Sequence, residues 1–545
     1  MRRILRSSLF ILGVGTAQGC LHSRPDMREY AIADIPAVSP DVGSSGILAA
    51  SAPPVSASIP TTSESKKLDI PADLPGASTP TFSLPKMAGM TAEQRAQTIQ
   101  THFPQLPAID PEPLATGDAL ALADLEQLAL ANNPKVKQAA AAVEAARGKM
   151  IQAGLLPNPE IGYQSDQMNS GVGVQTRGQQ GAFVGWEWIT AGKLSLARLA
   201  ESMAYANAQV ALRRTQIDVT VAVRQQYFAV LVAKQAIRVN RALATFSDEI
   251  YTAQLGLLQA GELAGYEPLQ SYVLAVQARG TLTQARNRYT SAWRQLAAVM
   301  GTPDLPQTEL AGYADAPAPE YTLDSIRELM LANHTDLQTA QNAIVEARYR
   351  LRLAEVTPIP NLKAQTYIEK DWSTPPYNTQ VGVQAGGAIP VFNRNQGGRL
   401  TARADLARAI QDVSRVQNDL SAQLAQSWEV YASNRVLIGY YRDHVIPNQV
   451  RVYRGTFERF RKDPQSINYN DVVVAQQTLA AALSAYLVSL ADQWSAVTNL
   501  TALSQQPELY PSGAIPAQSK SLDGLLAPPP PIEPTPTEAT SKPVK

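Results

Sequence analysis

Residues 122–161, LADLEQLALANNPKVKQAAAAVEAARGKMIQAGLLPNPEI, return without a gap as residues 323–362, LDSIRELMLANHTDLQTAQNAIVEARYRLRLAEVTPIPNL. Twelve of the forty aligned positions are identical, including the prolines of each Pro-x-Pro sequence near the end. An offset of 201 positions is too long for a solenoid, whose units run about 20–50 residues. The repeat therefore predicts one domain made of two equivalent halves, an arrangement suited to a wall around an axis.

The composition excludes several classes of protein. The chain has 545 residues, and its 47 Lys and Arg balance its 47 Asp and Glu, so no global charge favours nucleic acid. One cysteine excludes an intramolecular disulfide and a cysteine-rich metal site. The four histidines are scattered without ligand spacing, and we expect no cofactor and no metal site.

The N-terminus is typical of an export signal, which we assign to residues 1–19. Three arginines among the first six residues precede the apolar run 9–14. The following Ala17-Gln18-Gly19-Cys20 resembles a bacterial lipoprotein cleavage site and predicts lipidation of Cys20. That motif usually has Leu at the place of Ala17 and a small residue at the place of Gln18, so an ordinary signal peptide is the alternative.

Both ends of the mature chain lack sustained periodicity. Residues 20–117 are rich in Pro, Ser and Ala and predict a mostly disordered tether with one short helix around 91–100. Residues 507–545 predict a Pro-rich disordered tail. No uninterrupted apolar run of 18 or more residues follows the signal, so we expect no transmembrane helix. Any membrane crossing then requires strands of a closed barrel.

The first half, residues 118–310, combines short, long and extended segments. A helix over 122–156, broken at most at Pro134 and Gly148, ends at Pro157-Asn158-Pro159 because proline donates no helical hydrogen bond. Residues 193–255 contain no Gly or Pro and predict a helix of about 95 Å. The remaining expected elements are a hairpin within 160–190 with strands 160–168 and 182–190, a glycine-rich turn at 256–265 and a return helix 269–300.

The second half, residues 320–506, repeats this order. We expect a helix from 323, a hairpin within 362–389, a long helix 399–460 kinked at Pro447, a turn at Lys462-Asp463-Pro464 and a return helix 468–504. The entering and return helices together match one long helix in length. The simplest packing stacks each pair end to end beside its long neighbour, with both hairpins at one end and both turns at the other.

The strands alternate in character. In the second strand Val184, Trp186 and Trp188 form a bulky apolar face opposite a more mixed one. Strands of about nine residues fit a tilted bilayer crossing, but four strands cannot close a membrane barrel, so the chain is expected to oligomerise. Five aromatic residues are candidates for an interfacial belt, with packing inside a soluble hairpin as the alternative: Tyr163, Trp186, Trp188, Trp372 and Tyr377.

The duplicated order over residues 118–506 resembles the TolC-type outer-membrane efflux ducts. Residues 128–163 and the sequence AGKL at 191–194 are similar to the heavy-metal-efflux, CzcC-like branch. The resemblance implies a mainly α-helical fold with a β-barrel part, formed by a homotrimer with twelve strands and a helical tunnel. It also implies a passive exit duct in the outer membrane of a Gram-negative-type bacterium, joined by a periplasmic adaptor to an inner-membrane transporter of RND or ABC type.

The resemblance also implies roles for the turns. Gly261, Glu262 and Leu263 resemble the family's adaptor-docking tip, whereas the second tip, with Lys462 and Asp463, lacks the glycine. Asp471 and Glu267 match an acidic ring that lines the aperture in relatives. The alternatives are local: a glycine often simply ends a helix, and a carboxylate at a helix N-terminus is favoured by the helix dipole.

No motif indicates catalysis. The chain lacks a P-loop, GxSxG, HExxH and a dinucleotide-binding glycine pattern, so we expect no enzyme. The main alternative to a duct is a periplasmic helical-hairpin lipoprotein that acts as a spacer. A strict heptad would favour the spacer, but Arg224 and Lys234 lie within the apolar stripe of the long helix. The cargo, metal cations or drugs, is not encoded in any motif.

Overall fold

The computed structural model describes residues 73–75, 77–80, 82–85, 89–109, 119–166, 178–373, 375–463, 466–506 and 509. The chain divides into two compact units, Met1–Pro80 and Thr81–Lys545, and all that follows concerns the second. The export signal, Cys20, the loop 167–177, Pro464 and the C-terminal tail apart from Leu509 lie outside the described residues.

The sequence repeat is also a structural repeat. Helices α2 (Leu122–Asn132) and α3 (Pro134–Ala153) correspond to α6 (Leu323–Asn333) and α7 (Thr335–Val356). The helix expected over 122–156 is broken before Pro134, one of the two breaks named from the sequence, whereas Gly148 does not interrupt α3. The break has a local cause, because the Asn133 side chain accepts a hydrogen bond from Lys135 N at 2.9 Å and caps α3. His334 caps α7 at the equivalent position, accepting from Asp336 N at 3.2 Å.

The long helices occur where Gly and Pro are absent. Helix α4 (Lys193–Ala260) has 68 residues, which corresponds to about 100 Å. Its counterpart is formed by α8 (Gln396–Tyr440) and α9 (Ile446–Lys462), joined by the π-helical turn Tyr441–Val445. Pro447 in the first turn of α9 donates no backbone hydrogen bond, so the expected kink takes the form of this wider turn.

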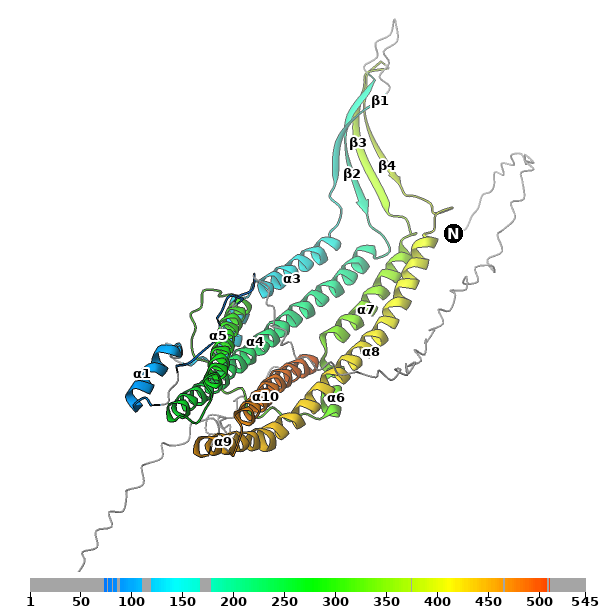
Figure 1. Ribbon diagram of the computed structural model, residues 1–545. Coiled ribbons are helices and arrows are strands. Elements are labelled where there is room, and N and C mark those ends of the chain that lie inside the picture. The colour runs from blue at the N-terminus through cyan, green and yellow to red at the C-terminus, as the bar shows by residue number, and fades with distance from the viewer. Residues whose placement is uncertain are drawn as a thin grey trace, which may run out of the picture. The chain divides into compact units, whose positions relative to one another are not determined.

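The short helices stack end to end, as their lengths predict. Helix α3 and the return helix α5 (Glu267–Met300) both pack along α4, while α7 and the return helix α10 (Tyr469–Ser504) both pack along α8 (Figure 1). Asn133 Nδ2 donates to Val299 O at 2.7 Å where α5 ends and α3 begins. Gln505 Nε2 donates to Thr335 Oγ1 at 2.9 Å at the matching junction of α10 and α7. Both junctions therefore lie partway along a long helix.

Two apolar clusters hold the helices together, one around the junctions and one towards the turns. Helix α10 contributes to both. It is also the described helix that is long and apolar enough to cross a membrane by length and composition. Its apolar residues have another explanation, since Trp494 stacks on Phe228 with ring centroids 3.6 Å apart and donates to Ala314 O at 2.7 Å. Interior packing thus accounts for part of the apolar composition of α10, whose most apolar window is 39% buried.

Four strands form one antiparallel sheet in the order β1-β2-β3-β4. They are β1 (Glu160–Asp166), β2 (Gln179–Trp188), β3 (Leu362–Asp371) and β4 (Thr379–Gly386). The two expected hairpins are present, and β2 pairs with β3, with Trp188 opposite Leu362. The sheet therefore joins the two halves of the repeat, and the helices continue from one end of it (Figure 1).

Part of the expected tether is packed. Helix α1 (Ala92–His102) occupies the place predicted for a short helix, and Ile99 and Phe103 are buried against Leu258 of α4. The short helix expected within the tether is present, and the segment 89–109 packs on α4 because two apolar side chains four positions apart give it a face that can be buried.

The stripe of α4 includes a buried charge. Arg224 is 3% exposed at its side chain, and its Nε lies 2.6 Å from Glu126 Oε1 of α2. Removing one partner of a buried ion pair takes away the opposite charge that offsets the desolvation of the other. We expect Glu126→Ala to destabilise the fold by about 3–5 kcal/mol, measured by thermal unfolding.

The matched control is Glu144→Ala, which removes an exposed pair with Arg147 at 3.4 Å within α3. Its expected effect is below about 0.5 kcal/mol. Equal effects of the two substitutions would contradict a structural role for the Arg224–Glu126 pair.

Candidate functional site

The sheet has one continuous apolar face. The register places apolar side chains of all four strands on the same side, interrupted by Thr366. Towards the strand connections this side continues as a polar row of Ser165, Gln180, Lys370 and Thr379. Most of the apolar side chains are exposed, for example Ile161 at 79% and Val383 at 73%. The face comprises Ile161, Tyr163, Ala182, Val184, Trp186, Trp188, Leu362, Ala364, Thr366, Ile368, Val381, Val383 and Ala385. A soluble sheet normally covers such a face, so this one requires an apolar environment.

The opposite face is polar. Gln164 of β1 donates through Nε2 to Glu369 of β3 and accepts from Gln365 Nε2 at 3.1 Å. These side chains meet across β2 because Gly181 lies between them, and a Cβ there would be 2.1 Å from Ile368 O. The sheet is therefore amphipathic, with hydrogen-bonded side chains on one side and unpartnered apolar ones on the other.

Four of the five residues expected in the aromatic belt form two pairs, one at each end of the strands. Trp186 and Trp188 stack with centroids 6.2 Å apart where β2 leads into α4. Trp372 and Tyr377 lie 6.3 Å apart at the β3–β4 connection, the other end of the strands. Tyr163 pairs with Ala182 between these ends. The apolar side chains of β3 from Leu362 to Ile368 span roughly 20 Å between the two aromatic pairs.

The sheet ends in two open edges. Within the described residues, β1 and β4 each pair on one side only. In lipid, where no water is present, the outer N–H and C=O groups of these edge strands can form hydrogen bonds only with another strand. In a single chain this sheet therefore lacks two things: an apolar environment for its exposed face and partner strands for its two edges.

The base of the sheet is fastened by the AGKL and Pro-x-Pro sequences. Ala191 and Gly192 have φ of 57° and 66°, which turns the chain from β2 into α4. Lys193 Nζ then donates to Asn361 Oδ1 at 2.7 Å, and Thr190 Oγ1 donates to Pro360 O at 2.6 Å. The motif of the first half is thus bound to the Pro-x-Pro sequence of the second.

Gly261 ends α4 at the opposite end of the molecule from the sheet. Its φ is +86°, and Glu262 N donates to Leu257 O at 3.0 Å, which satisfies the last carbonyl groups of the helix. A Cβ at Gly261 would meet nothing within 4 Å, so no close helix contact requires the glycine. Glu262 is exposed and Leu263 is half-buried.

The second turn lies beside the first. Ser271 Oγ of α5 donates to Tyr469 OH of α10 at 2.8 Å and also contacts Gln254 of α4. Burial raises the pKa of the Tyr469 hydroxyl, with a further contribution from Glu267. Lys462 and Asp463 are exposed at the end of α9. The two turns expected to share one end are therefore joined by a buried polar contact.

The two acidic candidates occupy helix starts. Glu267 is the first residue of α5 and half-buried. Asp471 is exposed in the first turn of α10, where its Oδ2 accepts from Asn468 N at 3.2 Å in a capping box. The structure gives Asp471 this local role, and a role at an aperture requires neighbouring chains.

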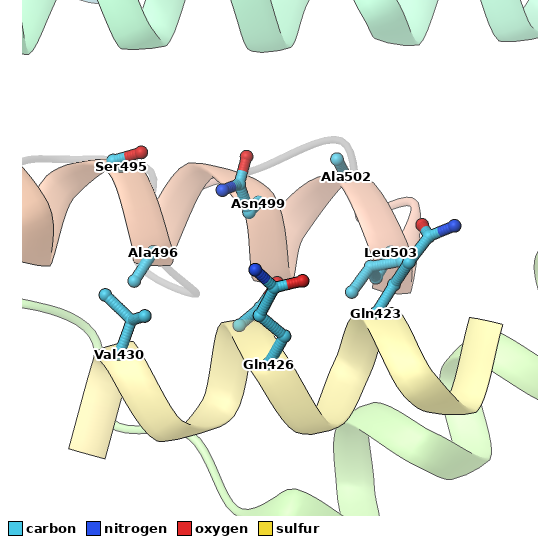
Figure 2. Close-up of a pocket in the computed structure, with 9 residues that line it drawn as sticks. Gln423, Gln426, Val430, Ser495, Ala496, Asn499, Ala502 and Leu503 are labelled. Atoms are coloured by element: carbon cyan, nitrogen blue, oxygen red, sulfur yellow. The ribbon is translucent and has the colours of Figure 1, made fainter. Parts of the chain in front are cut away.

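A groove of about 360 Å³ lies between α8 and α10 in the helical part (Figure 2). Its lining has amides, hydroxyls and small apolar groups but no charged side chain: Gln423, Gln426, Ser427, Val430, Ser495, Ala496, Asn499, Ala502 and Leu503. Among the described residues no group of three His, Cys, Asp or Glu side chains is placed to hold a metal ion.

Solved outer-membrane channels share this fold. The chain superposes on a crystal structure of CusC with a TM-score of 0.60 and 17% identity, covering 70% of this chain and 91% of CusC. It superposes on the outer membrane protein VceC from Vibrio cholerae with a TM-score of 0.59 and 14% identity, covering 70% and 96% of the two chains. Identities this low establish the likeness of fold alone.

The sequence comparisons agree with the fold. Residues 125–302 match the model of the outer membrane efflux protein family, so the chain carries a domain of that family. It is 23% identical over 379 residues to the cobalt-zinc-cadmium resistance protein CzcC of Cupriavidus metallidurans, covering 68% of this chain and 87% of the relative. The resemblance to outer-membrane efflux proteins is confirmed for residues 125–302, and the similarity to CzcC is consistent with the CzcC-like branch.

The geometry of Gly261 yields a local prediction. Gly261→Ala introduces no clash, but the positive φ makes it unfavourable by about 1–2 kcal/mol. The measurement is hydrogen exchange of the α4 amides near the turn, which should open more readily.

Gly256→Ala is the matched control, since Gly256 lies inside α4 with nothing within 4 Å of a Cβ. It should stabilise the helix end by up to about 1 kcal/mol. If Gly261→Ala protects these amides as well, the turn conformation described above is wrong.

Proposed function

We propose that the protein is the outer-membrane exit duct of an efflux pump and that it conducts its cargo passively. The observation that supports this most strongly is the amphipathic sheet with two free edges. Its apolar face fits the hydrocarbon of a bilayer, and its polar face fits a water-filled lumen.

Closure of the sheet requires several chains. Three copies would supply twelve strands, with β4 of one chain pairing with β1 of the next, and membrane barrels of this size are stable because no edge remains. The same three-fold arrangement would place the helical columns around a central tunnel. The resemblance to TolC-type ducts, which implies a homotrimer, supports this arrangement. The long helices would give it a reach of about 100 Å from the bilayer.

Export through such a duct needs energy from other proteins, because the sequence offers no nucleotide-binding motif. We infer that a periplasmic adaptor docks at the turns, around Gly261, Glu262 and Leu263 and around Lys462 and Asp463. An inner-membrane transporter of RND or ABC type would drive transport. The relative named for cobalt, zinc and cadmium resistance favours metal cations as cargo over drugs.

The periplasmic spacer is the alternative. It would also be anchored by lipid at Cys20, but it gives no reason for an exposed apolar face on a sheet whose opposite face is polar. The exposed band therefore favours membrane insertion. Anchoring by Cys20 remains an expectation from the N-terminal sequence.

Substitution on the two faces of β4 tests membrane insertion. Val383→Arg places a charge on the apolar face, where it should disfavour insertion into lipid by about 2–4 kcal/mol. The adjacent Gln384→Arg lies on the polar face and should insert normally. Refolding into phospholipid vesicles measures the difference in insertion. In outer membranes washed with high salt, the Val383→Arg variant should also yield a smaller amount of the heat-sensitive trimer.

A spacer predicts another outcome for the same pair. If both variants form the trimer equally and wash off the membrane once Cys20→Ala removes the lipid, the sheet does not lie in the bilayer and the duct is excluded.

Asp471 supplies a test of the aperture. In a trimer, three Asp471 carboxylates around a narrow opening would attract cations, and Glu267 would add three more nearby. Asp471→Asn removes the charge but keeps an acceptor for Asn468 N. We expect the preference for cations over anions in planar bilayers to fall at least about twofold.

Asn468→Ala is the control, because it weakens the cap of α10 without changing charge. Its cation preference should equal that of the unsubstituted channel. If Asn468→Ala and Asp471→Asn alter selectivity alike, Asp471 acts as a cap alone.

A further inference from the structure

An N-terminal segment lies on the α4–α5 hairpin near its turn. This segment, here called the strap, comprises the described residues 82–85 and 89–109 and includes α1. Figure 1 shows α1 in blue beside the ends of α4 and α5. The duct proposed above does not require such a segment, because both return helices already complete their columns without it.

The strap fills an apolar groove. Ile99 is 6% exposed and Phe103 is 4% exposed, and both pack on Leu258 of α4. The floor of this cluster is completed by Leu255 of α4 and Leu269 of α5. Phe82 adds an edge-to-face contact with Phe103 at 5.4 Å between centroids. The bound helix thus uses two apolar residues four positions apart, as helices in grooves commonly do.

Polar contacts align the strap with both helices. Arg95 Nη1 donates to Gln259 O of α4 at 3.2 Å, close to the carbonyl end of that helix. Tyr251 OH donates to Pro104 O at 2.8 Å. Arg279 Nε of α5 donates to Pro107 O at 2.7 Å, while its other nitrogens bind Asp248 of α4. The strap therefore spans the α4–α5 pair and covers it towards the turn.

The other side of α1 faces solvent and is polar: Glu93, Gln94, Gln97, Gln100 and Thr101 are exposed. A helix of 11 residues is marginal in isolation, so α1 depends on the groove for its structure. Two buried anchors, the partly buried Leu84 and Ile109 and three hydrogen bonds hold the strap, which is a small contact compared with the core packing of α4 and α5. These features suit a segment that can leave the groove.

We propose that the strap is a displaceable intramolecular ligand of a helix-binding groove formed by Leu255, Leu258 and Leu269. The external occupant of this groove is an amphipathic helix of a partner protein with apolar residues at positions i and i+4. This occupant rests on the proposed function, because a pump duct needs a partner at its turns. The strap then regulates docking by competing for the same surface.

Binding in trans tests the groove. The strapless variant lacks residues 82–109, and the probe is a fluorescent synthetic peptide of those residues, titrated in detergent. The peptide should bind the strapless trimer at least about tenfold more tightly than the intact chain, in which the groove is filled. A peptide with Ile99→Asp and Phe103→Asp should lose this binding, whereas a Gln97→Asp peptide should bind normally because Gln97 is exposed.

Competition tests the kind of partner. An unrelated Ala/Glu/Lys helical peptide with Leu at two positions four apart should displace the labelled strap peptide, and the same peptide with Ala at both positions should not. Absence of saturable strap binding to a folded strapless trimer overturns the proposal, as does equal binding to the intact chain. Failure of the leucine peptide alone to compete overturns the partner class.

The full chain provides a second measurement if the strapless variant does not fold. With Ile99→Asp and Phe103→Asp in the intact protein, trypsin should cleave at Arg95 at least about tenfold faster than in the unsubstituted protein, because local opening exposes the site. An unchanged cleavage rate overturns the proposal. Neither assay depends on conductance or on membrane insertion, so its result is independent of the sheet substitutions that test the duct.

Discussion

The requirement that every strand find a partner and every apolar face find an apolar environment governs this molecule. A single chain presents four strands with one apolar face, and it leaves β1 and β4 each open on one side. In water such a sheet would aggregate, and in lipid an open edge is strongly unfavourable. Barrel closure between copies satisfies both demands at once, which is why the proposed function and the proposed trimer follow from the same observation.

The helices have a related requirement, which is a packing neighbour for each long helix, and the duplicated halves meet it in the same way. Each long helix needs a neighbour along its whole length, but the chain has to return through the sheet at one end and through a turn at the other. Two short helices meeting end to end supply that neighbour. The junctions are then held by side chains at matching places, Asn133 with Val299 and Thr335 with Gln505. Because the same solution is used twice, the two halves can be joined edge to edge by β2 and β3.

The turns combine structural and functional demands on the same residues. Gly261 and Asp471 are explained locally, by a left-handed helix end and by a capping box. Those local roles do not conflict with docking or gating, since both residues are exposed in the single chain. The strap adds a third element to this end and makes the first turn differ from the second, although the repeat makes the two halves alike elsewhere.

The sequence by itself determined the repeat, the long helix without Gly or Pro, both hairpins and the end-to-end stacking, because these depend on periodicity, helix breakers and length. The apolar faces of the strands followed from the alternation around Trp186 and Trp188. The break at Asn133-Pro134, which the sequence left open, has a local cause as well, because the Asn133 side chain caps α3. Only the tertiary structure decided the burial of Arg224 beside Glu126 and the packing of Ile99 and Phe103 on Leu258. Contacts between residues far apart in the chain leave no periodic signal, so they become visible only when the elements are assembled.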